Sequence, residues 1–168
     1  TERALKYIRD NKDNPFFLYA AYTLPHFSSK DEDPDGFAVP STEPYSEKDW
    51  DEKTKKYAAM VHMFDRDDGR IVDLIEDLGL TEETLIIFTS DNGGHSTIEE
   101  RIDTNGPLRG HKRDLTEGGI RVPFIARWPG KIPAGKTSDE IVTFWDMMPT
   151  FAELAGTEPL PNIDGISV

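Results

Sequence analysis

Residues 84–95 read TLIIFTSDNGGH and join an apolar, β-rich run to an abrupt polar turn. The apolar part, 85–88, is short, continuous and ended by turn residues, which is typical of a buried strand in a parallel sheet. Ligands of open α/β sheets bind just outside the carboxyl ends of such strands. The turn that follows, beginning at Asp91 and Asn92, therefore lies where a site is expected.

Asp91 and Asn92 both offer oxygen atoms at this strand end. A carboxylate beside an amide carbonyl suits a hard cation such as Ca²⁺ or Mg²⁺. Gly93 and Gly94 would let the backbone turn sharply and bring it close to a ligand. From these residues alone, the alternative is that Asp-Asn-Gly-Gly is only a turn.

Two other stretches have the same apolar character, FFLYAAY at 16–22 and VPFIARW at 122–128. Apolar residues that recur at three- and four-residue steps predict an amphipathic helix over 1–12 and a long helix over 50–78. Helices that alternate with strands in this way indicate an α/β fold.

We expect the strands 16–22, 85–89 and 123–127 to share one sheet, with the helix 50–78 packed on one of its faces. The connection between the second and third strands is long and irregular, so these two are not expected to be hairpin partners. A last helix is predicted over 141–154, where a proline interrupts it or starts a new turn.

The segment GPLRGHKRDLTEGGIRVP, residues 106–123, combines four glycines with four cations, Arg109, Lys112, Arg113 and Arg121. An oxyanion ligand would explain this cluster, because lysine supplies a point charge and arginine a bidentate fork. The alternative is a structural set of ion pairs around Asp114 and Glu117. Composition leaves both explanations open.

The composition of the chain excludes several classes of function. Its 168 residues suit one domain with a real core, and its formal net charge of −13 argues against a nucleic-acid binder and against attraction to anionic membranes. The absence of cysteine excludes disulfides, a thiolate metal site and a thiol nucleophile within the chain. No apolar run is long enough to span a bilayer, and no signal peptide is visible at the start.

Three acidic residues and two loops offer weaker signals. Asp65, Asp67 and Asp68 fall on the predicted long helix, where Asp67 points away from the other two, so a solvated face explains them better than a metal site does. The polar stretches 28–49 and 96–105 are each either a substrate-side rim or a solvated surface loop.

Together the motifs resemble the sulfatases, in particular the arylsulfatase and glycosaminoglycan-sulfatase branch of the alkaline-phosphatase-like superfamily. The segments that carry the resemblance follow the family's order and cover most of the chain. They are NPFFLYAAYTLPH, FTSDNGGH, NGPLRGHKRDLTEGGIRVPFIARWPGKI, DMMPTFAELAG and DGISV. The resemblance implies part of a sandwich fold with a mostly parallel sheet flanked by helices.

The resemblance also implies roles for single residues. Asp91 and Asn92 match two ligands of the family's single divalent cation, usually Ca²⁺. Lys112 matches a lysine that binds the sulfate group, and His26 matches a histidine that binds the sulfate or helps the ester oxygen leave. Two further residues could reach substrate, His95 and Arg113. Residues His111, Glu117 and Arg121 are interpreted as packing, surface or loop-holding groups.

Other parts of the family's pattern do not occur here. Sulfatases carry a Cys/Ser-x-Pro/Ala-x-Arg segment whose first residue becomes the formylglycine nucleophile, and, near the natural N-terminus, a first metal-binding pair of adjacent aspartates. We therefore interpret residues 1–168 as the later portion of a sulfatase catalytic domain, a sulfuric ester hydrolase. The isolated chain is expected to be inactive and to bind Ca²⁺ weakly or not at all. It is also expected either to self-associate through exposed sheet edges or to be only marginally stable.

Two rival functions remain at this point. A phosphatase or phosphodiesterase of the same superfamily would place a histidine after the aspartate for a second zinc, whereas this chain has Asn92. A non-catalytic binding domain with a decayed site is the other rival. The implied partner is a sulfated small molecule or glycan. The chain itself does not give the compartment, which by family resemblance is periplasmic, extracellular or lysosomal.

Overall fold

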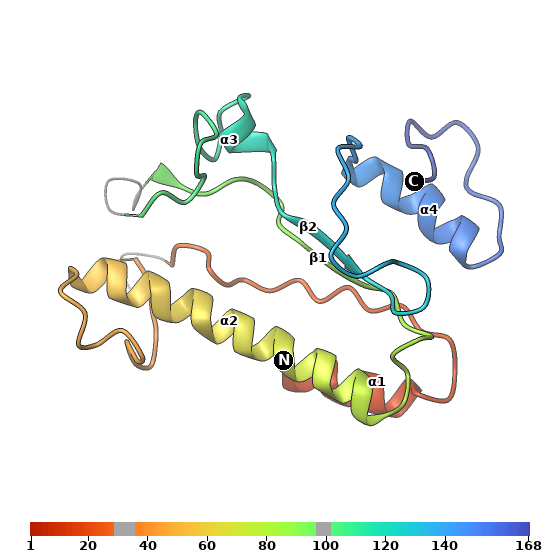
Figure 1. The fold of residues 1–168 in the computed structure, drawn as a ribbon, viewed down its shortest axis with the longest axis horizontal. Coiled ribbons are helices and arrows are strands. Elements are labelled where there is room, and N and C mark those ends of the chain that lie inside the picture. Colours follow the sequence, from red (N-terminus) through yellow and green to blue (C-terminus); the bar gives the residue numbers. More distant parts are fainter. Residues whose placement is uncertain (29–35, 97–101) are drawn as a thin grey trace. The chain divides into compact units, whose positions relative to one another are not determined.

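The computed structural model of the chain describes residues 1–28, 36–96 and 102–168 (Figure 1). It divides into two compact units, Thr1–Ala134 and Gly135–Val168, which we describe separately. The elements in chain order are α1 Glu2–Asn11, α2 Glu52–Asp77, β1 Ile86–Thr89, α3 Glu117–Ile120, β2 Phe124–Arg127, the 3₁₀ helix η2 Phe144–Asp146, and α4 Met147–Leu154. None of the helices in these ranges is both long and apolar enough to cross a membrane.

The long helix α2 confirms the prediction made from its apolar stripe. Its N-cap is Asp51, whose carboxylate accepts hydrogen bonds from the Thr54 amide at 3.1 Å and the Thr54 hydroxyl at 2.7 Å. The helix runs without a break through Gly69 to Asp77. Just beyond it, Gly79 has a φ of +71°, which lets the Leu80 amide bond back to the Ile75 carbonyl at 3.0 Å.

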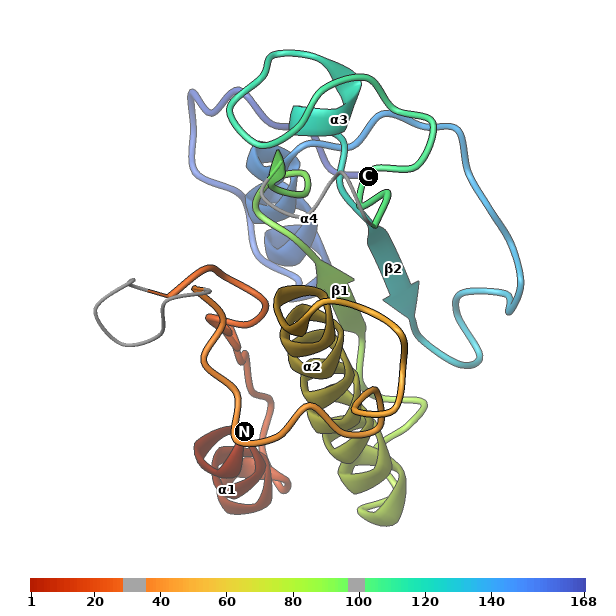
Figure 2. The ribbon, with the colours of Figure 1, turned by 90° about the vertical axis from the view of Figure 1, so that its left-hand side faces the viewer.

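The main core lies where α1 crosses the C-terminal half of α2. Leu5 and Ile8 of α1 and Leu74 and Ile75 of α2 are buried there, with Ile86 of β1 packed against them. In Figures 1 and 2 the two helices lie side by side at that end of α2. The predicted amphipathic helix at the N-terminus is therefore confirmed, and its buried stripe anchors the start of β1.

The prediction that the second and third strands do not pair is wrong. β1 and β2 form a two-stranded antiparallel sheet in which Ile86 faces Arg127 and Thr89 faces Phe124. A long connection excludes a tight turn between strands, but it does not exclude antiparallel pairing once the connection folds back on itself. The prediction that α2 packs beside the sheet is confirmed, because the Phe64 and Phe88 rings are 5.6 Å apart.

The first predicted strand, 16–22, is extended but hydrogen-bonds to no other strand in the described part of the chain. Its side chains still alternate as in a strand, since Phe16 and Leu18 pack on the core while Phe17 is 65% and Tyr19 81% exposed. A strand needs a partner backbone, and none of the described residues provides it. The mostly parallel sheet is thus not seen, and self-association of the isolated chain stays a prediction.

The second unit is organised around Asp146. Its carboxylate accepts hydrogen bonds from the Thr143 hydroxyl at 2.7 Å, the Ile166 amide at 3.0 Å and the Thr143 amide at 2.8 Å, and these bonds lower the pKa of the Asp146 carboxyl. The predicted last helix therefore starts later than expected, with η2 as its first turn. Pro149 fits inside the first turn of α4, where an amide hydrogen has no helical partner.

Candidate functional site

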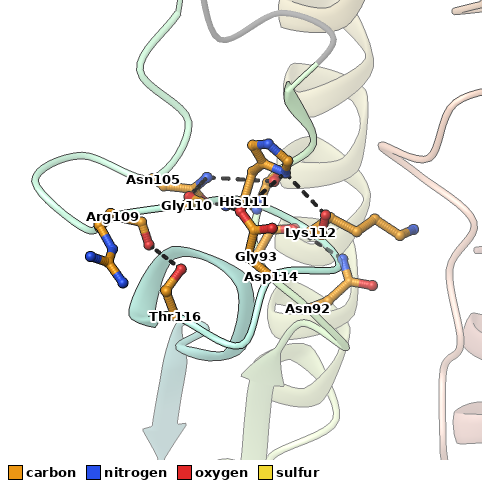
Figure 3. A network of polar contacts seen from close by, with 10 residues as sticks. Asn92, Gly93, Asn105, Arg109, Gly110, His111, Lys112, Asp114 and Thr116 are labelled. Atoms are coloured by element: carbon orange, nitrogen blue, oxygen red, sulfur yellow. Dashed lines mark hydrogen bonds and ion pairs between the residues drawn. The ribbon is translucent and has the colours of Figure 1, made fainter.

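Asn92 and Lys112, two of the predicted site residues, lie on two loops that contact each other through their backbones (Figure 3). The first loop, 91–95, follows β1, and the second loop, 109–119, includes the first residues of α3 and precedes β2. Backbone hydrogen bonds join them from Gly93 N to Gly119 O, 3.1 Å, and from Lys112 N to Gly94 O, 2.8 Å. The antiparallel pairing of β1 and β2 brings the two loops to the same end of the sheet.

Glycines are required where the two loops touch. A Cβ atom on Gly93 would lie 1.8 Å from the Gly118 carbonyl oxygen, and a Cβ on Gly118 would lie 2.0 Å from the Gly110 carbonyl oxygen. Both distances are far below van der Waals contact, and the obstructing atoms are backbone. The sequence is glycine-rich here because main chain meets main chain with no room for side chains.

Asn105 ties the two loops together, and sequence reasoning did not single it out. Its Oδ1 accepts a hydrogen bond from the Gly94 amide at 2.8 Å, and its Nδ2 donates to the Gly110 carbonyl at 3.1 Å. The only signal in the sequence was an asparagine directly before the Gly106-Pro107 turn, which is a common turn residue. Its partners became visible only when the loops came together.

Asp91 and Asn92 present oxygen atoms that fit a hard cation in kind. The Asn92 Nδ2 donates to the Gly93 carbonyl at 3.0 Å, so its donor group is used and its Oδ1 is turned away from that contact. The Asp91 side chain is exposed. Ca²⁺ takes roughly six to eight oxygen ligands, so these two side chains would supply only part of a site. Within the described ranges, no group of three or more His, Cys, Asp or Glu side chains could hold a metal ion.

Lys112 and His26 meet although 86 residues separate them in sequence, because Lys112 Nζ lies 3.2 Å from His26 Nε2. The other ring nitrogen, Nδ1, is 2.7 Å from the Phe27 carbonyl oxygen, which can only accept a hydrogen bond. Nδ1 therefore carries the hydrogen, and Nε2 accepts one from the ammonium group of Lys112. The histidine thus presents its lone pair to the lysine.

The two explanations of the cation cluster apply to different residues. Arg121 pairs with Glu117 at 3.4 Å, and the His111 amide donates to the Asp114 carboxylate at 3.0 Å, which holds the second loop together. Lys112 and Arg113 pair with no carboxylate in the part of the chain that the structure describes. The same holds for Arg109, so these three cations are the ones that an anion could use, and Lys112 is the one that contacts His26.

His95 lies within electrostatic reach of Arg113 and Lys112. Partial burial, followed by the charges of Arg113 and Lys112, lowers the pKa of the His95 imidazole. Arg113 has a φ of +86°, a left-handed conformation that is uncommon outside glycine. A strained residue next to Lys112 is consistent with a functional constraint on this loop.

Replacing Arg113 by glycine is expected to raise the free energy of unfolding by about 1 kcal/mol, because the left-handed conformation costs a side-chain-bearing residue about that much. The same change should weaken sulfate binding if the guanidinium group contacts the anion. Denaturant unfolding and sulfate calorimetry measure the two effects. Arg113→Ala is the control, since it removes the guanidinium but keeps the strain. If Arg113→Gly lowered the free energy of unfolding as much as Arg113→Ala does, the backbone at residue 113 would not be strained.

Lowering the pH is expected to destabilise the fold through His95. Its folded pKa lies below the ordinary value of 6.5, so the unfolded chain takes up the proton first as the pH falls through 6.5. The loss of stability grows until the pH passes the folded pKa, and it is absent at higher pH. Titration of the His95 Cε1 proton by NMR measures the shift. Arg113→Gln should move the His95 pKa back toward 6.5, and an unshifted wild-type midpoint would refute the prediction.

Comparison with known proteins gives the same result by sequence and by structure. The family model described as Sulfatase matches residues 1–157. Human steryl-sulfatase is 39% identical over 176 residues, an alignment that covers 98% of this chain and 27% of that protein. Human arylsulfatase A is 36% identical over 154 residues, covering 90% of this chain and 27% of that protein.

Solved structures also match. The crystal structure of Ps i-CgsB in complex with k-i-k-neocarrahexaose has a TM-score of 0.80 and 35% identity, and the match covers 98% of this chain and 35% of that one. BT4656 in complex with its substrate D-glucosamine-2-N,6-O-disulfate has a TM-score of 0.58 and 33% identity, covering 68% of this chain and 22% of that one. This chain therefore spans about a quarter to a third of the length of these proteins.

Proposed function

Because the chain belongs to the sulfatase family, we propose that it forms part of an enzyme that hydrolyses sulfate esters and that it contributes one side of the active site. The observation that supports this most directly is the position of Lys112. Its ammonium group contacts His26, pairs with no carboxylate among the described residues, and sits on the loop bonded to the one that carries Asp91 and Asn92. This arrangement suits a tetrahedral anion.

The cation side of the proposed site consists of the Asp91 carboxylate and the Asn92 side-chain oxygen. Oxygen donors of this kind favour Ca²⁺, which would act as a Lewis acid on a sulfate oxygen when bound. The remaining ligands and the formylglycine nucleophile are assigned to parts of the protein outside this chain. Asp91 and Asn92 would serve to hold the cation beside the anion position.

Lys112 and His26 would bind the sulfate group, and His26 would take part in proton transfer. Lys112 donates to a sulfate oxygen and stabilises the negative charge that develops there. To help the ester oxygen leave, His26 Nε2 would have to release Lys112 and donate to that oxygen a proton taken up from water, while Lys112 keeps its charge. The bond from Nδ1 to the Phe27 carbonyl keeps the ring oriented for that transfer. His95 and Arg113 are assigned to substrate binding.

The proposed substrate class is a sulfated carbohydrate or an aryl sulfate. The D-glucosamine-2-N,6-O-disulfate named as the substrate of BT4656 supports a sulfated sugar, and the relation to arylsulfatase A supports an aryl ester. Such an enzyme would work in a periplasmic, extracellular or lysosomal compartment. The charge of −13 in this chain fits neither a nucleic-acid partner nor an anionic membrane surface.

The experiment that tests the proposal is to assay the full-length protein with matched sulfate and phosphate esters of one phenol, and with sulfated saccharides, in CaCl₂. We expect sulfate release and slow phosphate release. Faster phosphate release would favour the phosphatase alternative, and release of neither would favour a binding domain. The isolated 168-residue chain should show no turnover, and micromolar Ca²⁺ binding by it would contradict the assignment of the other ligands elsewhere.

A further inference from the structure

The side chain of Asn105 bonds to the backbones of both site loops. Its Oδ1 accepts from the Gly94 amide at 2.8 Å on the first loop. Its Nδ2 donates to the Gly110 carbonyl at 3.1 Å on the second loop, with a longer contact of 3.4 Å to the Gly94 carbonyl. Figure 3 shows it beside Gly110 and His111, on the network between the loops.

Other side-chain bonds in this network stay within one loop. Asn92 bonds to the neighbouring Gly93 carbonyl, Asp114 accepts from the His111 amide, and Thr116 donates to the Arg109 carbonyl at 2.7 Å. These contacts shape each loop separately. Asn105 instead bonds to Gly94, two residues beyond Asn92, and to Gly110, two residues before Lys112.

We propose that Asn105 is a positioning residue that sets the separation between the oxygen atoms of Asp91 and Asn92 and the ammonium group of Lys112. This inference rests on the proposed function, in which one anion contacts the cation and Lys112 at the same time. An anion can bridge the two positive groups only at one separation. Asn105 bonds to both loops by its side chain and so helps to fix that separation, together with the backbone bonds from Gly93 N to Gly119 O and from Lys112 N to Gly94 O.

The chemistry of the asparagine amide is needed for this role. One end must accept a hydrogen bond from an amide and the other must donate to a carbonyl, and an amide side chain does both. An aspartate side chain is not equivalent, because Asn105→Asp keeps the acceptor for Gly94 but turns an anionic oxygen toward the Gly110 carbonyl. Asn105→Ala removes both bonds.

The test is the energetic coupling between a cation and an anion in the full-length protein. The dissociation constant of inorganic sulfate is measured by calorimetry after removal of metal with a chelator, and again in saturating CaCl₂. If the wild-type loops hold the cation and the Lys112 ammonium group against the same anion, CaCl₂ should lower the dissociation constant of sulfate about tenfold. That is a typical coupling between two sites. The coupling ratio is the dissociation constant of sulfate without metal divided by that in CaCl₂. In Asn105→Ala and Asn105→Asp this ratio should fall to about one.

Thr116→Ala is the matched control, because it removes one hydrogen bond in the same network without touching the link between the loops. It should lose a similar amount of stability and keep the wild-type ratio. If Asn105→Ala does not fold, Asn105→Asp decides the question. The role of Asn105 is overturned if either Asn105 variant keeps the wild-type ratio of dissociation constants. It is also overturned if the ratio falls to about one in Thr116→Ala. A wild-type protein that binds no sulfate in either condition overturns the proposed function, and this inference with it.

Discussion

Replacing Gly93 by alanine is expected to lower the free energy of unfolding by about 3 kcal/mol, at the upper end of the usual cost of overpacking. The new methyl group would lie 1.8 Å from the Gly118 carbonyl oxygen and 2.8 Å from its carbon. Neither loop can give way easily, because hydrogen bonds from Gly93 N to Gly119 O and from Gly118 N to Arg109 O hold both backbones. Denaturant unfolding of the full-length protein measures the change.

Gly69→Ala is the matched control for this prediction. Gly69 lies inside α2, and a Cβ there meets nothing within 4 Å. Alanine should therefore raise the free energy of unfolding by about 0.5–1 kcal/mol, because it restricts the unfolded chain and favours the helix. If the two alanine variants changed stability alike, the tight contact between the loops would be refuted.

Asp91→Ala and Lys112→Ala are each expected to reduce kcat/KM of the full-length protein about 10²–10³-fold, the scale for loss of one preorganised electrostatic group. Asp91→Ala would remove a ligand of the cation, and Lys112→Ala a direct contact with the charge that builds up on the sulfate. His95→Ala should cost less and act mainly on KM. Steady-state kinetics on an aryl sulfate in CaCl₂ separates these effects.

Lys131→Ala controls for the loss of a positive charge, since Lys131 is exposed in the turn after β2. It should leave kcat/KM unchanged. Added CaCl₂ should partly restore Asp91→Ala, whose defect is in cation binding, and should not restore Lys112→Ala. Activity of Lys112→Ala within about threefold of wild type would remove the lysine from the site, because that is far less than loss of an electrostatic group should cost.

The sequence predicted the helices better than the sheet, for a physical reason. The stripes of α1 and α2 are local patterns, and Leu5, Ile8, Leu74 and Ile75 were buried as their spacing required. Strand pairing is non-local, and nothing near residues 86–89 specifies that their partner is 124–127. The extended segment 16–22 shows the same limit, because its alternation is strand-like while its backbone partner is not encoded within it.

The site was predictable where chemistry is local and unpredictable where loops meet. The Asp91-Asn92 pair could be proposed from its place after a strand. The contact between His26 and Lys112 came only from family resemblance, because 86 residues separate them. Neither local chemistry nor family resemblance pointed to Asn105, since an asparagine before a glycine turn is common. Its role appears only when the fold brings the Gly94 amide and the Gly110 carbonyl to its side chain.

The glycine contact between the two loops divides nearby positions into fixed and variable ones. A Cβ atom would overlap backbone atoms at Gly93, Gly118 and Gly119, so almost no other residue can replace glycine at these positions. Leu115, in the same second loop, is 92% exposed and constrained by little. Related genes could therefore vary outward side chains such as Leu115, while the backbone contacts that hold the loops of the proposed site stay the same.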